Sequence, residues 1–183
     1  AGVIRIDGEE RSWSSSREAE QAGIVLIHQE LNLAEHLTLT QNLFLGHELT
    51  RGGLLDERTM ATRAQHYLEQ VGLQRAPATK VRQLIVAEKQ LVEIARALAR
   101  QARLLIMDEP TATLTPGETA RLFALIARLK AQGTTIIYIS HKLDEVKQIT
   151  DEIVVMRDGR FVNRGETASF SRQQMANLMV GRE

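Results

Sequence analysis

The stretch Leu-Leu-Ile-Met-Asp-Glu-Pro at residues 104–110 decides the fold class of this chain. Four apolar residues that end abruptly in two carboxylates and a proline are typical of a strand in a parallel sheet, and we expect all four to be buried. Residues 117–132 follow with the pattern of an amphipathic helix, and residues 134–139 form a β-branched strand. Strand, helix and strand in this order predict a parallel βαβ unit.

The rest of the chain extends this unit into an α/β layer domain. A short apolar strand at residues 24–27 precedes two amphipathic helices, one from Asp56 to Gly72 and one that starts at Glu88. These helices form an insert at about residues 56–100. After the βαβ unit the pattern predicts a short helix at residues 142–149 and a hairpin at residues 152–163 that turns at Asp158 and Gly159. A terminal helix is predicted at residues 171–179.

Composition and charge exclude several classes of function. Of the 183 residues, 43% are hydrophobic and 25% are charged, as in an ordinary globular protein. The 23 basic residues balance 23 acidic ones, so no overall positive field attracts the chain to nucleic acid or anionic lipid. Because cysteine is absent, disulfides, thiolate metal sites and cysteine nucleophiles are excluded. The apolar runs are far shorter than the roughly 20 residues of a membrane-spanning helix, and the first residues look like a chain entered midway rather than a signal peptide.

Three predicted strands end in polar residues, and parallel strands place their carboxyl ends along one edge of a sheet. Asp108 and Glu109 follow one strand, and their physical interpretation is a metal-bound aspartate beside a glutamate that accepts a proton. The alternative is a pair of solvated acids that open a turn before the next proline. His141 either faces the same ligand or is a surface residue beside a helix cap. Gln29 is either a site residue or an ordinary surface amide.

Four segments of the sequence resemble the ATP-binding-cassette (ABC) transporter ATPases in their order and spacing. The first is Val-Leu-Ile-His-Gln-Glu-Leu-Asn-Leu at residues 25–33, and the second is Leu-Ile-Val-Ala-Glu-Lys-Gln-Leu-Val-Glu-Ile-Ala-Arg-Ala-Leu at residues 84–98. The third is Leu-Ile-Met-Asp-Glu-Pro-Thr at residues 105–111, and the fourth is Tyr-Ile-Ser-His at residues 138–141. The first two, with the ending Met-Val-Gly-Arg-Glu, look like the importers of ribose, xylose and galactose, which carry two such domains in tandem.

This resemblance implies an α/β fold similar to that of P-loop NTPases, with a mostly parallel sheet, a helical insert and a small β subdomain. It implies that residues 1–183 are a partial ABC ATPase domain that is truncated at the N-terminus. The helical subdomain, which contains the signature segment, then lies at about residues 56–100.

The resemblance also implies that the domain binds ATP and Mg²⁺. Asp108 then orients Mg²⁺ through water, and Gln29 senses Mg²⁺ and water. Glu109 polarises the attacking water and His141 contacts the γ-phosphate, so these two are the catalytic residues. The phosphate-binding string G-x-x-x-x-G-K-[ST] is missing from the sequence, and the chain on its own is therefore expected to be inactive.

The family's signature loop, usually Leu-Ser-Gly-Gly-Gln, is replaced by Leu84, Ile85, Val86, Ala87 and Glu88. Carried over, these residues contact the nucleotide, but Ile85 has no hydroxyl to offer and Ala87 adds a Cβ where glycine allows close approach. The alternative is that Ile85 and Val86 are only the buried start of the helix. A second departure is Thr115, which stands where the family's D-loop has an acid.

The function that the resemblance implies is an ATPase coupled to carbohydrate transport, which energises sugar import through a membrane permease. Its partners are a second cassette in tandem, the permease subunits and, indirectly, a periplasmic sugar-binding protein. No nucleic-acid partner is expected, and the location is peripheral, on the cytoplasmic face of the bacterial inner membrane. The alternative is an ABC-type ATPase that acts on nucleic acid or the ribosome; basic tracts or coiled-coil insertions would mark it, whereas this insert is short. A third candidate is a non-hydrolysing interaction module.

Overall fold

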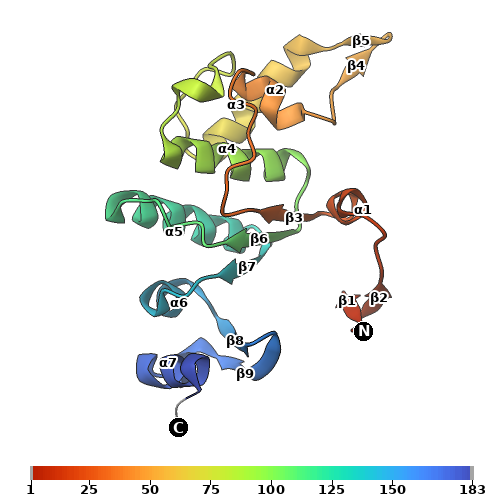
Figure 1. Cartoon of the computed structure of the whole chain (residues 1–183). Helices are drawn as coiled ribbons and strands as arrows, with labels where there is room; N and C mark the ends of the chain where they lie inside the picture. Colours follow the sequence, from red (N-terminus) through yellow and green to blue (C-terminus); the bar gives the residue numbers. More distant parts are fainter. Residues whose placement is uncertain (1, 182–183) are drawn as a thin grey trace.

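A computed structural model describes residues 2–181 of the chain (Figure 1). A helical layer lies at the top of this view, a three-stranded sheet with one long helix beside it lies in the middle, and a hairpin with a helix forms the C-terminal end. The chain enters through a small hairpin and one short helix, which are β1 (Ile4–Ile6), β2 (Glu9–Arg11) and α1 (Ser16–Gln21).

The central sheet has the order β3-β6-β7 and is parallel throughout. Its strands and the helix that connects the last two are β3 (Ile24–Ile27), β6 (Leu104–Asp108), β7 (Thr135–Ile139) and α5 (Pro116–Ala131). The predicted βαβ unit is therefore confirmed. In the register, Ile27 lies opposite Met107 and Asp108 lies opposite Ile139, so the three strands end at nearly the same level.

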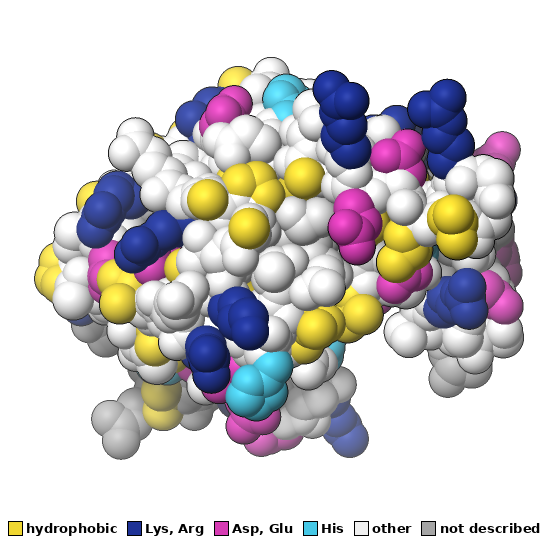
Figure 2. All heavy atoms as spheres, turned by 90° about the horizontal axis from the view of Figure 1, so that it is seen from above, with side chains coloured by type: hydrophobic (Ala, Val, Ile, Leu, Met, Phe, Trp, Pro, Cys, Tyr) yellow, Lys and Arg dark blue, Asp and Glu magenta, His cyan; other side chains and the backbone are white. Residues whose placement is uncertain are grey.

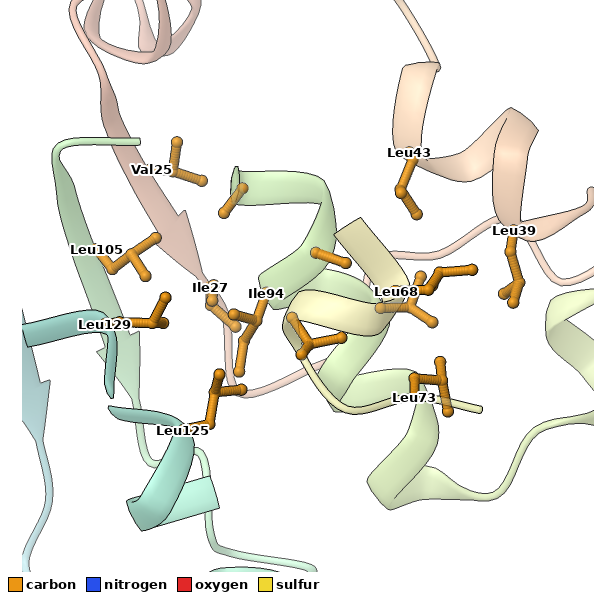
Figure 3. Close-up of a cluster of buried hydrophobic side chains, with 14 of the residues drawn as sticks. Val25, Ile27, Leu39, Leu43, Leu68, Leu73, Ile94, Leu105, Leu125 and Leu129 are labelled. Carbon is orange, nitrogen blue, oxygen red and sulfur yellow. The ribbon is translucent and has the colours of Figure 1, made fainter. Parts of the chain in front are cut away.

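The helical layer contains three helices, namely α2 (Leu39–Phe44), α3 (Glu57–Gln70) and α4 (Val86–Ala99). The helix α4 packs against both other helices and against β3, and it thereby joins this layer to the sheet. Figure 3 shows the result as one continuous core, in which Leu68 of α3, Ile94 of α4, Ile27 of β3 and Leu125 of α5 all lie in the same cluster. Between α2 and α3 the chain forms the small hairpin of β4 (Thr50–Arg51) and β5 (Leu54–Leu55).

The strands β3 and β6 each bury only one of their faces, and β7 has no fully buried residue. Leu105 and Met107 are buried, whereas Leu104 and Ile106 are half-buried, so the expectation that all four apolar residues of β6 are buried was wrong. The reason is that successive side chains of a strand point to opposite faces. The buried face packs on α4 and α5 (Figure 3), while on the opposite face Ile139 is 46% exposed.

The C-terminal unit has a small core of its own. It consists of α6 (Leu143–Ile149), β8 (Glu152–Arg157), β9 (Arg160–Glu166), a 3-10 turn (Thr167–Ser169) and α7 (Arg172–Val180). Ile153, Val155 and Met175 form its core. Both residues of the hairpin turn, Asp158 and Gly159, have positive φ values of 52° and 71°, as a two-residue turn of this kind requires. The predicted hairpin and terminal helix are confirmed. Within residues 2–181 no helix is both long enough and apolar enough to cross a membrane.

Candidate functional site

The polar residues that follow the three strands lie at one edge of the sheet, as the sequence predicts. Asp108 is the last residue of β6 and pairs in register with Ile139, the last residue of β7. His141 follows two residues after that strand end. Gln29 follows two residues after the end of β3, and its side chain is exposed. The carboxyl edge of a parallel sheet is where open α/β folds bind their ligands.

Glu109 and His141 are brought into direct contact. His141 Nδ1 lies 2.8 Å from Glu109 Oε1, although the two residues are 32 positions apart. The backbone of Glu109 has a φ of 44°, in the left-handed region that residues with a side chain rarely adopt. Its N–H donates a hydrogen bond to the carbonyl of Ile139 at 2.9 Å. A backbone outlier of this kind costs about 1–3 kcal/mol and persists only where the surroundings hold it, which is common at functional sites.

Two residues at this edge could supply oxygen ligands to a metal ion. Asp108, at the end of the middle strand, has a carboxylate, and Gln29, just after the neighbouring strand, has an amide oxygen. Within residues 2–181 there is no cluster of three or more histidine, cysteine or acidic side chains of the kind that holds a metal ion without help. This sparse set of hard oxygen donors matches Mg²⁺, which keeps several waters and shares one or two carboxylates with substrate phosphates.

A second polar cluster lies directly behind this edge, and sequence analysis missed it. Glu145 of α6 accepts hydrogen bonds from the hydroxyls of Thr111, at 2.7 Å, and Tyr138, at 2.7 Å. Lys142 Nζ donates to the Thr111 carbonyl at 3.0 Å and lies 3.3 Å from the Glu145 carboxylate. The sequence carried no signal for this cluster, because its members come from different segments that meet only in the folded chain.

Burial and hydrogen bonding shift the pKa values in this cluster. Burial alone would raise the pKa of Glu145, but the hydrogen bonds from Tyr138, Thr111 and Lys142 outweigh it and hold the pKa below its ordinary value. Burial raises the pKa of the Tyr138 hydroxyl, and its hydrogen bond to Glu145 raises it further. The cluster is therefore a charged carboxylate with neutral hydroxyl donors around it over the whole physiological pH range.

The segment 84–88 lies elsewhere, at the start of α4 in the helical layer. Ile85 is 60% exposed and Val86 is 46% exposed, so the interpretation of both as a buried helix start is wrong; only Leu84 is buried, at 6%. Ala87 is half-buried. The side chain of Glu88 accepts a hydrogen bond from the Ile85 N–H at 3.1 Å and pairs with Arg75 at 2.8 Å. These contacts stay within the helical layer and do not join the segment to Glu109 or His141.

The loop after Gln29 is fastened to α4, which links the helical layer to the sheet edge. Glu93, which is only 5% exposed, accepts a hydrogen bond from the Asn32 N–H at 2.9 Å. Arg96 donates to the Asn32 carbonyl at 2.9 Å and also forms an ion pair with Glu93. Burial lowers the pKa of Arg96, and the Glu93 charge opposes that effect. The loop that carries Gln29 is therefore attached to α4 through Asn32.

The sequence of this chain is similar to those of curated bacterial import proteins. The chain is 46% identical over 181 residues to the putative ribose/galactose/methyl galactoside import ATP-binding protein 1 of Burkholderia ambifaria, with 99% of this chain and 35% of that protein covered. It is 48% identical over 182 residues to the xylose import ATP-binding protein XylG of Escherichia coli K12, with 100% of this chain and 36% of that protein covered. The chain thus spans about a third of the length of the curated relatives it matches.

The fold agrees with solved structures of the same kind. A dimeric structure of a post-hydrolysis state of the ATP-binding cassette MJ0796, bound to ADP and Pi, is similar with a TM-score of 0.74 and 25% identity, over 93% of this chain and 75% of that one. The family profile described as "ABC transporter" matches residues 1–112. The α/β fold with a parallel sheet and the resemblance drawn from the sequence are both confirmed. The chain belongs to the ABC transporter family.

Proposed function

We propose that this chain is part of an ATP-hydrolysing subunit that energises sugar import through an ABC membrane permease. The observation that carries the proposal is the contact between Glu109 Oε1 and His141 Nδ1 at 2.8 Å, next to Asp108 at the carboxyl edge of the sheet. The names of the relatives support the substrate class, since they describe ribose, galactose and xylose import.

In this proposal Glu109 accepts a proton from the attacking water and His141 contacts the γ-phosphate of ATP. Phosphoryl transfer depends mainly on positioning and on stabilising charge at the phosphate oxygens, so a carboxylate and an imidazole already held together suit the reaction. The hydrogen bond from the Glu109 N–H to Ile139 fixes the first of these groups to the end of β7.

Asp108 and Gln29 are the residues that would hold Mg²⁺ in this site. When bound, the ion would neutralise charge on the β- and γ-phosphates of ATP. The chain's contribution is to present the Asp108 carboxylate at the end of β6 and the Gln29 amide on a loop that Glu93 and Arg96 attach to α4. The position of the amide thus depends on the position of the helical layer.

The proposal extends to the other parts of the assembly. Residues 1–183 would form a partial ABC ATPase domain, and residues 56–100 together with α2 would form the helical subdomain that carries the signature segment. That segment, residues 84–88, would contact a nucleotide held by a second cassette. The permease subunits would bind this assembly at the cytoplasmic face of the inner membrane and receive sugar from a periplasmic binding protein.

The surface of the helical layer does not favour a nucleic-acid partner. Figure 2 shows this layer from above, with basic and acidic side chains interspersed over the visible face instead of one continuous basic stripe. Nucleic-acid binding draws most of its affinity from several basic side chains placed together along phosphates. The balance of 23 basic and 23 acidic residues agrees with that picture.

The substitution Glu109→Gln in the assembled transporter tests the function. We expect nucleotide binding to be retained and ATP turnover to fall by about 10²- to 10⁴-fold, because the amide keeps the shape but cannot accept the proton. ATP binding and phosphate release would be measured side by side, with Glu152→Gln on the C-terminal hairpin as a control that removes a carboxylate far from the site. Near-normal turnover in Glu109→Gln would contradict the catalytic role.

A further inference from the structure

The polar cluster of Thr111, Tyr138, Lys142 and Glu145, here called the Glu145 cluster, connects the two segments that carry the catalytic residues. Thr111 is 2% exposed and lies two positions after Glu109. Lys142 directly follows His141, and Glu145 comes one turn later. The side chain of Glu145 is only 13% exposed, and both of its oxygens accept hydrogen bonds from Thr111, at 2.9 Å and 2.7 Å.

We propose that Glu145 is a positioning residue that holds His141 against Glu109. The inference rests on the proposed function, since it assumes that these two residues act together on bound ATP. The side chain of His141 is 65% exposed, and its ring is hydrogen-bonded to Glu109. An exposed ring with one hydrogen bond is weakly restrained by its own contacts. Its place must therefore come from the backbone that carries it.

The Glu145 cluster supplies that backbone restraint from both sides. Thr111 ties the loop after Glu109 to Glu145, and Lys142 ties the residue after His141 back to the carbonyl and hydroxyl of Thr111, at 3.0 Å and 3.2 Å. Tyr138 adds a third attachment from within β7. The two segments are thus joined by partly buried hydrogen bonds that do not involve the side chain of Glu109 or His141.

The carboxylate of Glu145 is the group that makes this arrangement possible. It accepts from two hydroxyls and faces the Lys142 ammonium at 3.3 Å, so all of its neighbours are donors. A glutamine at this position keeps the size but has a single acceptor oxygen, and its NH₂ group can neither accept from a hydroxyl nor pair with the Lys142 ammonium. The substitution Glu145→Gln therefore breaks the cluster without removing volume.

The first test uses the chain itself and does not depend on ATP hydrolysis. The amides of Glu109 and Lys142 are hydrogen-bonded, to Ile139 at 2.9 Å and to Ser140 Oγ at 3.0 Å, and their hydrogen exchange reports on the two segments. In Glu145→Gln we expect both amides to exchange about tenfold faster. The matched control is Asp144→Asn, one position earlier on α6, where the side chain is 71% exposed and pairs with Arg172. Unchanged exchange in Glu145→Gln would overturn the proposal.

The second test measures turnover in the assembled transporter. For Glu145→Gln we expect kcat to fall about tenfold while KM for ATP stays within about twofold, because positioning affects the reacting geometry more than binding. Thr111→Val should act in the same way, whereas Thr111→Ser, which keeps the hydroxyl, should restore kcat. Faster exchange with an unchanged kcat would assign the cluster a purely structural role and overturn the proposal.

Two further variants allow the proposal to be tested if Glu145→Gln does not fold, and separate it from the proposed function. If Glu145→Gln does not fold, Tyr138→Phe removes a single hydroxyl from the same carboxylate, and the same exchange and kcat changes are expected in smaller degree; their absence would overturn the proposal. The variant Glu109→Gln separates this inference from the proposed function. Normal turnover in Glu109→Gln removes the function itself, whereas loss of turnover there with normal turnover in Glu145→Gln removes only the positioning role.

Discussion

Thr115 shows how a residue that departs from the family pattern acquires a local role. It is the N-cap of α5, where its hydroxyl accepts from the Glu118 N–H at 3.4 Å and the Glu118 carboxylate accepts from the Thr115 N–H at 2.8 Å. This reciprocal pair is a capping box, and proline at the next position suits the first turn of a helix. Thr115 thus defines the start of the helix that connects β6 to β7, and its side chain is hydrogen-bonded within the first turn of that helix.

Glu145 gives a residue-level prediction about pH. Its pKa in the folded chain lies below the ordinary value of 4.5, because the hydrogen bonds of the Glu145 cluster outweigh the effect of burial. A carboxylate of this kind stabilises the folded state fully above its unfolded value, and the contribution is lost as the pH falls through the lower folded value. We therefore expect the difference in unfolding free energy between the native chain and Glu145→Gln to shrink as the pH falls below 4.5.

Urea denaturation of both proteins from about pH 7 down to about pH 3 measures this difference, with Asp144→Asn as the exposed reference. The gap between native chain and Glu145→Gln should be constant near neutrality and close at acid pH, since a protonated glutamic acid resembles glutamine. A gap that persists unchanged at the lowest pH would show that the charge of Glu145 does not stabilise the fold.

At the scale of elements, the long periodic helices were predictable, whereas one of the short helices was missed. The helices α3, α4 and α5 each have 14 to 16 residues, enough for the apolar spacing to identify a buried face. The helix α2 has only 6 residues, which is less than two turns, so its pattern gives no period and the sequence analysis missed it. Burial on β6 was overestimated because apolar residues alone do not reveal which face of a strand is covered.

Some residues of the candidate site were predictable from the sequence and others were not. Asp108, Glu109, His141 and Gln29 were predictable because each stands at or just after the end of an apolar strand, and strand order places those ends together. The Glu145 cluster was not, since its members come from three segments and meet only through the tertiary fold. Its polar residues are ordinary in sequence and become distinctive only through burial.

Asn42 provides the prediction for the helical layer. It is 0% exposed, its side chain donates to the carbonyls of Ala34 and Thr38 at 3.0 Å and 2.9 Å, and its oxygen accepts from the Ala34 N–H at 2.8 Å. It thereby fastens α2 to the loop that follows β3. We expect Asn42→Ala to lower the free energy of unfolding by about 2 kcal/mol, because the substitution leaves buried backbone groups without partners.

Urea denaturation of the chain checks this value, and Asn177→Ala on α7 is the control. The Asn177 side chain takes part in an exposed hydrogen bond with Gln173, so a change of no more than about 0.5 kcal/mol is expected there. An equal loss in both variants would contradict the special role of Asn42 in attaching α2.

At the scale of the whole molecule, the candidate catalytic residues and the segment 84–88 belong to different layers. Glu109 and His141 lie at the end of the sheet, whereas Ile85 stands at the exposed start of α4. The contacts of Glu93 and Arg96 with Asn32 form one of the polar links between those layers. In the proposed assembly of two cassettes, one chain therefore contacts two nucleotides. It contributes the residues for hydrolysis to one of them and a signature segment without its hydroxyl to the other.

This difference predicts asymmetry between the two nucleotide sites of the assembled transporter. The site that uses Asp108, Glu109 and His141 should hydrolyse ATP if the partner's signature loop is normal. At the other site Ile85 has no hydroxyl for the γ-phosphate, and a hydrogen bond to a charged acceptor is worth about 1.5–3 kcal/mol. Because Ile85 is 60% exposed at the start of α4, a serine placed there would be free to make that bond. We expect Ile85→Ser to raise nucleotide retention or turnover at this second site more than at the first.

Labelled nucleotide trapped separately at each site, before and after the substitution, measures the effect. Leu54→Ser is the matched control, since Leu54 is also an exposed apolar residue of the helical layer, at 76%, but stands on the β4–β5 hairpin away from α4. The control should leave both sites as they are, so a gain with Leu54→Ser as large as that with Ile85→Ser would point to a general effect of surface polarity. Equal occupancy and equal turnover at the two sites of the unmodified protein would contradict the asymmetry directly, because a signature segment without its hydroxyl would then cost nothing.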